Sequence, residues 1–340
     1  MNEKIAIDEQ GYFLLDNNLR MNDASFGHFL LKNLSIDERF ALWTLTPDHR
    51  ALLVEPFDKP LVVQNIEIRE DALWALWPYN HSSPINPETL CFDDWGRLIG
   101  WTETKIPFVF LKKAQDAFWN NVKPLNATTF EWAGKTYSPG PYYLTSQEAA
   151  QHQFWETRFA HDNTPWDLNG PHPAIDPILL QLKLQKSRFI NFGCGKGHDA
   201  HFIAKKGHIV HAIDVSPSAI EYAKKMYPKP PHLRWSCEDV FHLQEPLKAD
   251  VIFEHTFFCA LPPSQRKDLI RLWLNSLEDT GYLLGIFFVN PKRFGPPYGC
   301  SEWELRELLE PYFRLMYWKR WEVSPPNRHG TELVVFAQKY

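Results

Sequence analysis

The chain has 340 residues, enough for two domains of ordinary size. Hydrophobic residues make up 44% and charged residues 23%, which excludes wholesale disorder. The formal net charge of −5 argues against nucleic acid as a partner, since phosphate binding needs a basic surface. We find neither an apolar run long enough to span a bilayer nor a signal-peptide pattern at the N-terminus. These features predict no membrane partner and a cytoplasmic location.

Residues 1–145 alternate short apolar runs with turn residues, a pattern typical of strands in a mainly antiparallel sheet. Two helices are expected, over Ser25–Leu34 and Lys112–Val122, where apolar residues recur at helical spacing. We therefore predict an α+β domain over residues 1–145.

Apolar strands and helices alternate strictly in the second half, which predicts a parallel sheet covered on both faces. The strands are expected at 187–193, 208–215, 233–239, 249–256 and 281–289, with helices at 199–206, 216–228, 262–277 and 301–312. Two last strands, 313–323 and 331–340, flank a turn and form a terminal antiparallel pair, as in class I methyltransferases. We predict such a doubly wound, Rossmann-like sheet over residues 147–340, preceded by the separate α+β domain.

A glycine-rich loop follows the first strand of this half and opens a helix. Gly193, Gly195 and Gly197 allow the backbone to approach a ligand closely at the helix N-terminus. Asp214 ends the next strand, where a carboxylate can accept both ribose hydroxyls of a nucleoside. A solvent-facing Asp214 beside a helix N-cap is the alternative.

The glycine spacing separates two kinds of nucleoside cofactor. A dinucleotide fingerprint needs a third glycine where this chain has His198, which disfavours nicotinamide-dependent oxidoreduction. The G-x-G-x-G spacing suits a nucleoside without phosphate, S-adenosylmethionine. Asp239 and the amide of Val240 follow the third strand, where such enzymes contact adenine, although CEDVF taken alone is only a polar strand end.

Five segments, in order and spacing, resemble the thiopurine S-methyltransferase family, closest to its plant and microbial thiol/halide methyltransferase branch. They are FWETRFAHDNTPWDLNGPHP, NFGCGKGHDAHFIAKKGHIVHAIDVS, CEDVF, ADVIFEHTFFCALPPSQR and FGPPYG. The resemblance covers roughly residues 150–340. It implies a methyltransferase fold, S-adenosylmethionine as cofactor and an aromatic N-terminal segment that folds over it.

The resemblance also implies which residues bind the cofactor: Trp155, Phe159, Trp166, Gly193, Asp214, Asp239, Val240 and His255. Phe159 stands where related plant enzymes carry Trp, which keeps an aromatic surface. His255 replaces a family Tyr or Arg, which changes the charge near the methyl group. As an alternative, Trp155 and Phe159 share one helical face and would serve equally well as core residues.

Two residues are predicted on the acceptor side. His255 would lie beside the methyl group, and its protonated ring could attract an anion below neutral pH. Tyr298, in the rigid loop GPPYG at 295–299, is the expected substrate-lining group. Both enter the hypothesis as catalytic residues.

No metal site is expected. His198 and His201 have no carboxylate or cysteine partner at ligand spacing, and the strand residues His208 and His211 point to opposite faces. The five cysteines form no C-x-x-C pair and are expected to be reduced, with a lowered pKa conceivable for Cys194 at a helix N-terminus.

The leading hypothesis is methyl transfer from S-adenosylmethionine to a small soft nucleophile: a thiol or thiopurine-like compound, with halide, selenium or tellurium species of the same kind. The alternative is a cofactor-sensing regulatory protein with little catalysis. Residues 1–145 resemble an uncharacterised bacterial α+β domain family, from which no function transfers, so a protein partner of this half stays unknown.

Overall fold

A computed structural model describes residues 3–15, 18–145, 152–228, 232–243 and 247–340. The chain divides into two compact units, residues 1–144 with 301–304 and residues 145–300 with 305–340. The predicted division at 145–147 lies beside this boundary, although the short segment Ser301–Glu304 belongs to the first unit. No helix in the described ranges is long and apolar enough to cross a membrane.

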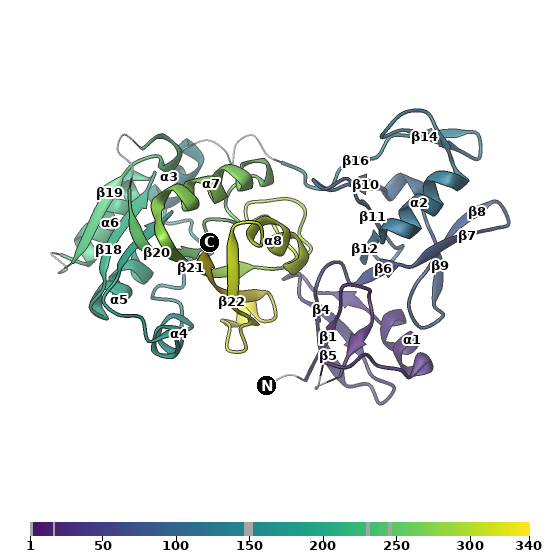
Figure 1. Ribbon diagram of the computed structural model, residues 1–340, viewed down its shortest axis with the longest axis horizontal. Coiled ribbons are helices and arrows are strands. Elements are labelled where there is room, and N and C mark those ends of the chain that lie inside the picture. Colours follow the sequence, from purple (N-terminus) through teal and green to yellow (C-terminus); the bar gives the residue numbers. More distant parts are fainter. Residues whose placement is uncertain (1–2, 16–17, 146–151, 229–231, 244–246) are drawn as a thin grey trace. The chain divides into compact units, whose positions relative to one another are not determined.

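The described part of the first unit has four small β-sheets and two α-helices (Figure 1). The five-stranded sheets have the orders β2-β1-β5-β4-β3 and β16-β10-β11-β12-β6, and the three-stranded sheets β7-β8-β9 and β13-β14-β15. The first eight strands are β1 (Lys4–Ile7), β2 (Phe13–Leu14), β3 (Ser35–Ile36), β4 (Leu42–Leu45), β5 (Ala51–Pro56), β6 (Leu61–Val63), β7 (Asn65–Arg69) and β8 (Ala72–Leu76). The others are β9 (Ser82–Pro84), β10 (Cys91–Phe92), β11 (Leu98–Trp101), β12 (Pro107–Phe110), β13 (Lys123–Pro124), β14 (Phe130–Trp132), β15 (Lys135–Tyr137) and β16 (Gly140–Pro141).

The prediction of a single sheet is therefore wrong, whereas its mainly antiparallel pairing is confirmed, because nine of the twelve strand pairs in the described part of this unit are antiparallel. The strands distribute over four sheets, and β1 with β5, β6 with β12 and β10 with β16 pair in parallel. Short apolar runs indicate that a strand forms but not which strand it joins, because pairing depends on contacts distant in the sequence. The two predicted helices are present as α1 (Ala24–Lys32) and α2 (Lys112–Asn121), and Asp23 caps α1 by accepting the Phe26 amide at 2.9 Å.

The second unit contains a seven-stranded sheet of order β19-β18-β17-β20-β21-β23-β22, with only β23 antiparallel to both neighbours. The strands are β17 (Arg188–Phe192), β18 (Ile209–Asp214), β19 (Leu233–Cys237), β20 (Ala249–His255), β21 (Leu277–Phe288), β22 (Phe313–Arg320) and β23 (Glu332–Lys339). The helices are α3 (His152–Ala160), α4 (Ile175–Leu182), α5 (His198–Lys205), α6 (Pro217–Met226), α7 (Arg266–Ser276) and α8 (Glu302–Leu309), whose first residues belong to the first unit. The predicted doubly wound, class I methyltransferase sheet is confirmed.

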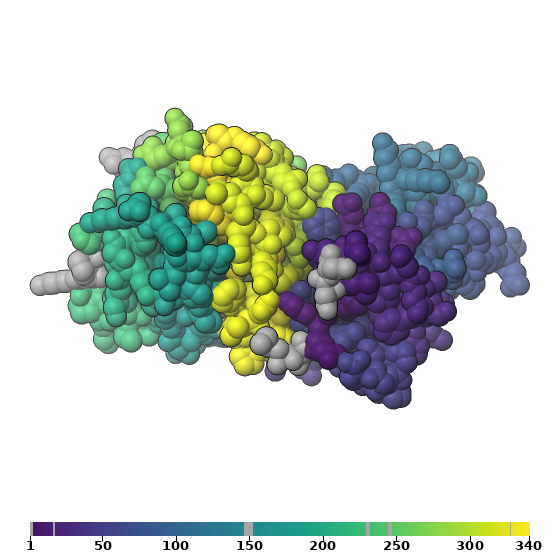
Figure 2. Space-filling view, turned by 60° about the horizontal axis from the view of Figure 1, so that its bottom comes forward, coloured from purple at the N-terminus to yellow at the C-terminus, as the bar shows by residue number. Residues whose placement is uncertain are grey.

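Helices cover both faces of this sheet. Ile178 of α4 and Ile203 of α5 share one buried cluster with Leu284 and Phe336, and Figure 2 shows the teal residues of α4 beside the yellow C-terminal strands. Side chains alternate along a strand, so Phe287 of β21 points to the other face, where its ring lies 6.3 Å from Trp273 of α7. The strand order reverses between β17 and β20, which places a ligand crevice at their carboxyl ends.

The first unit buries a cluster of charges. Lys59 Nζ lies 2.9 Å from Glu304 and 3.5 Å from Asp58, and Arg97 pairs with Asp58 at 2.6 Å and with Asp93 at 2.7 Å. The side chains of Lys59, Asp58 and Glu304 are at most 3% exposed. Burial alone would lower the pKa of Lys59, but the charges of Glu304, Tyr142 and Asp58 together outweigh it and raise that pKa. Each charge is stable here only because its partners are present.

Replacement of Lys59 by Met removes the cation and leaves buried carboxylates uncompensated. We expect the free energy of unfolding of the first unit to fall by about 3–5 kcal/mol, the usual effect of breaking a buried ion pair. Urea unfolding of the full chain, followed by Trp fluorescence, measures it. Lys123→Met is the matched control, because the Lys123–Glu131 pair is exposed and should contribute at most about 1 kcal/mol. Equal losses in both variants would contradict a stabilising role for the cluster.

Candidate active site

A cavity of about 710 Å³ lies at the carboxyl ends of the parallel strands. The eight residues that sequence analysis assigns to the cofactor all line it: Trp155, Phe159, Trp166, Gly193, Asp214, Asp239, Val240 and His255. They come from five chain segments, and the structure brings them around one space. Their contacts with the cofactor stay a prediction.

The glycine loop forms the floor of this cavity. Gly193, Gly195 and Gly197 have φ angles of 62°, 52° and 78°, a region that residues with a Cβ rarely adopt. A Cβ on Gly193 would lie 2.3 Å from the Phe257 ring, and one on Gly197 would lie 2.4 Å from the Trp235 ring. The turn therefore requires glycine for conformation and for space, and α5 begins directly after it.

Asp214, at the end of β18, is hydrogen-bonded to the glycine loop that follows β17 and to the segment before α6. One carboxylate oxygen accepts the Gly195 amide at 2.8 Å and the other accepts the Ser216 amide at 2.9 Å. Burial raises the pKa of Asp214, while these backbone hydrogen bonds oppose that shift. Each oxygen keeps a second lone pair that can accept a ribose hydroxyl, so one side chain can hold both the loop and the nucleoside.

Two histidines contact Asp239, which follows β19, the strand next to the one that ends in Asp214. The Asp239 carboxylate accepts the Phe241 amide at 3.0 Å and lies 2.5 Å from His242 and 3.1 Å from His152. Burial would raise the pKa of Asp239, but the hydrogen bond with His242 lowers it. An ionised carboxylate at this position can accept the exocyclic amine of an adenine.

Aromatic side chains close the cavity from the N-terminal side. Trp166 contacts Trp155 and Phe159 edge-on, with ring centroids 5.7 and 5.8 Å away, and Phe159 reaches within 3.4 Å of the Cβ position at Gly195. We call α3 and residues 161–170 the lid segment. The predicted aromatic lid thus has the geometry that the hypothesis requires, and none of its described α3 residues is fully buried in a core.

Polar contacts tie the lid segment to the strand ends. Lys196 of the glycine loop pairs with Asp162 at 2.6 Å and with Asp167 at 3.0 Å. Glu156 of α3 accepts the hydroxyls of Ser216 and Ser218 at 2.6 and 2.5 Å, at the N-terminus of α6. The carboxylate also compensates the positive end of that helix.

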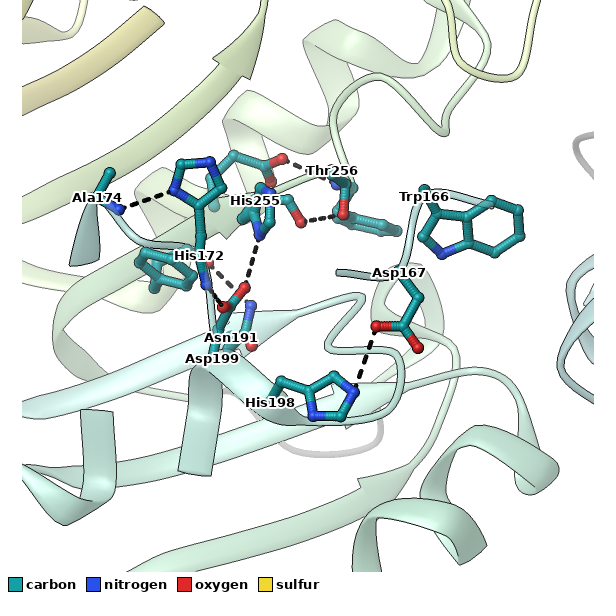
Figure 3. A network of polar contacts seen from close by, with 12 residues as sticks. Trp166, Asp167, His172, Ala174, Asn191, His198, Asp199, His255 and Thr256 are labelled. Carbon is teal, nitrogen blue, oxygen red and sulfur yellow. Dashed lines mark hydrogen bonds and ion pairs between the residues drawn. The ribbon is translucent and has the colours of Figure 1, made fainter. Parts of the chain in front are cut away.

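His255 ends β20 in a buried polar network (Figure 3). Its Nδ1 lies 2.6 Å from the Asp199 carboxylate and its Nε2 lies 2.8 Å from Nη1 of Arg328. Arg328 also donates to Glu332 at 3.2 Å and to the Trp166 carbonyl of the lid segment. His172 Nε2 lies 3.0 Å from Glu332, and the rings of His172 and His255 meet edge-on at 4.9 Å.

The network shifts several pKa values. Burial and, less strongly, the charge of Arg328 lower the pKa of His255 against the opposing effect of Asp199. Burial would raise the pKa of Glu332, but the His172 hydrogen bond and the Arg328 charge lower it to about 2. His255 is therefore neutral near pH 7, and Arg328 carries the positive charge that the sequence hypothesis gave to a protonated His255.

Tyr298 is placed differently from its prediction. Its side chain is fully buried, its amide donates to the Cys259 carbonyl at 2.7 Å, and it is not among the residues that line the cavity. A Pro-rich loop is commonly exposed, whereas this one folds its aromatic residue inward. The lowered pKa considered for Cys194 is also wrong, because burial and the nearby Asp214 charge raise it.

The histidines that the sequence analysis considered as metal ligands contact other side chains of the fold. His198 contacts Tyr227 and Asp167, His201 stacks on Tyr227 at 4.0 Å, and His211 bonds Ser236. Elsewhere, ligand atoms of His172, His255 and Glu332 lie within 4.8 Å of one another. The Arg328 guanidinium donates to two of these three, so a cation already occupies the space between them.

The comparisons with known proteins identify the family. The sequence model of the thiopurine S-methyltransferase family matches residues 150–339 of this chain. The chain belongs to this family. A probable thiol methyltransferase 2 of Arabidopsis thaliana is 32% identical over 161 residues, 46% of this chain and 71% of that protein. Thiocyanate methyltransferase 1 of the same plant is 30% identical, covering 52% and 81%, and thiopurine S-methyltransferase of Aliivibrio fischeri (strain MJ11) is 24% identical, covering 47% and 83%.

As a member of this family, the chain is a methyltransferase whose cofactor is S-adenosylmethionine and whose acceptor is a small molecule. The cavity fits that cofactor on its own geometry. The glycine floor exposes backbone, because a Cβ at Gly193 or Gly197 would collide with a neighbouring ring. Asp214 offers two acceptor oxygens, and aromatic faces suit a sulfonium.

Sequence reasoning missed several residues of the site. Lys196 and Asp199 stand within the glycine motif itself, where charged residues among glycines could have drawn attention. Arg328 gave no signal, because it lies in a terminal turn 73 residues from the His255 that it contacts. Glu332 and His172 were equally hidden by their distance along the chain.

Replacement of Asp214 by Ala removes the ribose acceptor and releases the Gly195 amide. Hydrogen bonds to charged groups contribute about 1.5–3 kcal/mol each, so the dissociation constant of S-adenosylhomocysteine should rise at least tenfold. Titration calorimetry measures it. Asp250→Ala, at the other end of the same sheet, is the control and should bind normally. An unchanged affinity in folded Asp214→Ala protein would remove the ribose assignment.

A fragment of residues 147–340 tests the predicted domain division. The cavity is lined only by residues between His152 and Asn275, all in the second unit. We expect the purified fragment to bind S-adenosylhomocysteine within threefold of the full chain. A soluble, folded fragment that shows no heat of binding would mean that residues 1–145 are needed for the site.

Proposed function

We propose that this enzyme transfers the methyl group of S-adenosylmethionine to the sulfur of a small thiol that attacks as its thiolate. Thiopurine-like compounds and halide, selenium or tellurium anions are acceptors of the same soft kind. The names of the three relatives above, which specify thiol, thiocyanate and thiopurine acceptors, support this acceptor class. The cytoplasmic location stays a prediction.

One observation carries the proposal: both ring nitrogens of His255 are engaged. Nδ1 faces Asp199 at 2.6 Å and Nε2 faces a guanidinium donor at 2.8 Å. A general base must have a free lone pair within reach of the proton that it removes. Since His255 has none, the favoured acceptor is one that is already ionised. A thiol of pKa about 8.5 is a few per cent thiolate at pH 7.

The other residues then have binding and alignment roles. The bound cofactor supplies an electrophilic methyl group on a sulfonium. Asp214, Asp239 and the Val240 amide would hold its nucleoside, while the glycine loop lets backbone approach it closely. Trp155, Phe159 and Trp166 would exclude water and add a cation–π attraction of about 0.5–2 kcal/mol. Alignment of two bound reactants can supply about 7–11 kcal/mol of the barrier reduction.

The pH dependence follows from a neutral His255. The sequence hypothesis implied a bell-shaped profile, with anion attraction fading as His255 loses its proton near pH 6.5. Because the folded pKa of His255 is lowered, that proton is already lost below the neutral range. No falling limb should therefore arise from His255 at neutral or alkaline pH.

At subsaturating thiol, we expect the rate to rise about tenfold per pH unit below the pKa of the thiol and then to level off. His255→Gln should show the same shape. The pH dependence of the rate is measured as release of S-adenosylhomocysteine with a series of thiols of pKa about 6 to 10. The pH at which the rate stops rising should follow the pKa of each thiol.

Hydroxyl compounds of matched size are the control acceptors. Comparable rates with them would contradict a soft nucleophile while leaving the cofactor and fold unchanged. A falling limb near pH 6.5 that disappears in His255→Gln would instead restore the cationic role of His255.

A further inference from the structure

Five side chains from five places in the fold form one continuous, largely buried hydrogen-bonded chain. Its order is Asp199, His255, Arg328, Glu332 and His172. Asp199 lies in the first turn of α5, His255 ends β20, Arg328 ends η5 (Pro326–Arg328), Glu332 begins β23 and His172 precedes α4. Exposure ranges from 0% at His172 to 16% at Asp199. Figure 3 shows the Asp199 carboxylate bonded to the His255 ring and to the backbone amide of His172.

The proton positions on His255 follow from its neighbours. Arginine has donors only, so Arg328 Nη1 at 2.8 Å requires His255 Nε2 to accept. The proton of a neutral ring must then be on Nδ1, where the Asp199 carboxylate accepts it at 2.6 Å. A second proton on Nε2 would set two donors against each other.

His172 is fixed in the opposite tautomer. Its Nδ1 accepts the Ala174 amide at 3.1 Å, so its proton is on Nε2 and is donated to Glu332 at 3.0 Å. Glu332 thereby has a donor on each oxygen, one from His172 and one from Arg328 at 3.2 Å. Asp199 also uses both oxygens, because the second accepts the His172 amide at 2.8 Å.

The charges of these five hydrogen-bonded side chains are therefore assigned. The two carboxylates are ionised, Arg328 is a cation, and both imidazoles are neutral. The titratable groups that shift the pKa of His255 all belong to this set, with Asp199 and Arg328 at its nitrogens and His172 against its ring. Arg328 is the permanent positive charge in contact with the acceptor-side histidine.

We propose that Asp199 and Glu332 are positioning residues that hold His255 as its neutral Nδ1–H tautomer and fix Arg328 as the cation beside it. The tautomer follows from the hydrogen bonds alone, whereas its consequence for acceptor choice rests on the proposed function. A neutral histidine with no free lone pair cannot deprotonate an acceptor. The hydrogen-bonded network of these five side chains therefore selects nucleophiles that arrive as anions. Asp199 lies in the first turn of α5, directly after the glycine loop, so the hydrogen-bonded network connects the cofactor loop with the acceptor side.

Asp199→Asn is the sharpest test, because it preserves shape and changes donors. If the amide oxygen faces the His172 amide, its NH₂ group faces His255 Nδ1 and forces the proton to Nε2, against Arg328. If the amide turns over, the NH₂ group faces the His172 amide instead. Either orientation opposes two donors, whereas Asp176→Asn on α4 changes an exposed carboxylate outside the chain and serves as the control.

Nitrogen-15 NMR of histidine-labelled full-length protein reads the tautomer without any turnover, and His255→Gln assigns the signal. We expect a neutral Nδ1–H ring for His255 from pH 6 to pH 8 in the wild type and in Asp176→Asn, and loss of that state in Asp199→Asn. An Nε2–H ring or an imidazolium in the wild type at pH 7 would overturn the proposal. An amide that turns over in Asp199→Asn would still accept from Nδ1–H, so an unchanged tautomer in that folded variant overturns the proposal when the His255 signal of Glu332→Gln is also unaltered.

Kinetics supply the second readout. With a thiol acceptor, kcat should fall at least tenfold in Asp199→Asn, whereas the pH profile should gain no new limb near neutrality, because loss of the Asp199 charge lowers the pKa of His255 further. Loss of cofactor affinity with an unchanged kcat would mean a merely structural role and would refute positioning.

Glu332→Gln is the second variant in case Asp199→Asn fails to fold, because Glu332 lies outside the cavity lining. It should likewise release Arg328 and alter the His255 signal, and an unaltered signal would count against the proposal. If the wild type methylates no thiol, the proposed function fails, while the NMR result still decides the tautomer.

Discussion

The site depends on one hydrogen bond, from the Gly195 amide to the buried Asp214 carboxylate. It joins the turn after β17 to the end of β18, and so fixes the glycine loop relative to the strand that carries the ribose acceptor. The same carboxylate accepts the Ser216 amide before α6. A single carboxyl side chain thus organises two helix N-termini around the cavity.

Around this floor, charge pairing replaces apolar packing. The lid segment is joined to the floor through Lys196 with Asp162 and Asp167, and to α6 through Glu156. These polar contacts hold the segment at its periphery, while the aromatic rings, which meet edge-on, line the cavity. The lid can therefore present aromatic faces to a sulfonium without losing its own attachment.

The parts of the site that are local in sequence could be predicted, and those that are distant could not. The glycine loop, Asp214 and Asp239 follow strands whose apolar runs mark them, so both fold and cofactor end were accessible. Arg328 approaches His255 only because β23 returns beside β21. Tyr298 was misplaced and the sheets of residues 1–144 were miscounted for the same reason, since local patterns do not specify which distant segments meet.

The substitution of His for the family Tyr or Arg at position 255 now has a physical meaning. A tyrosine would offer a hydroxyl and an arginine a charge, whereas this histidine offers neither, because Asp199 and Arg328 take both nitrogens. The positive charge lies instead on Arg328, which contacts His255 and also donates a hydrogen bond to Glu332. Under the proposed function, an electrostatic attraction that acts through a neutral ring would favour small polarisable anions, because they tolerate a weakly polar first contact better than strongly hydrated oxyanions do.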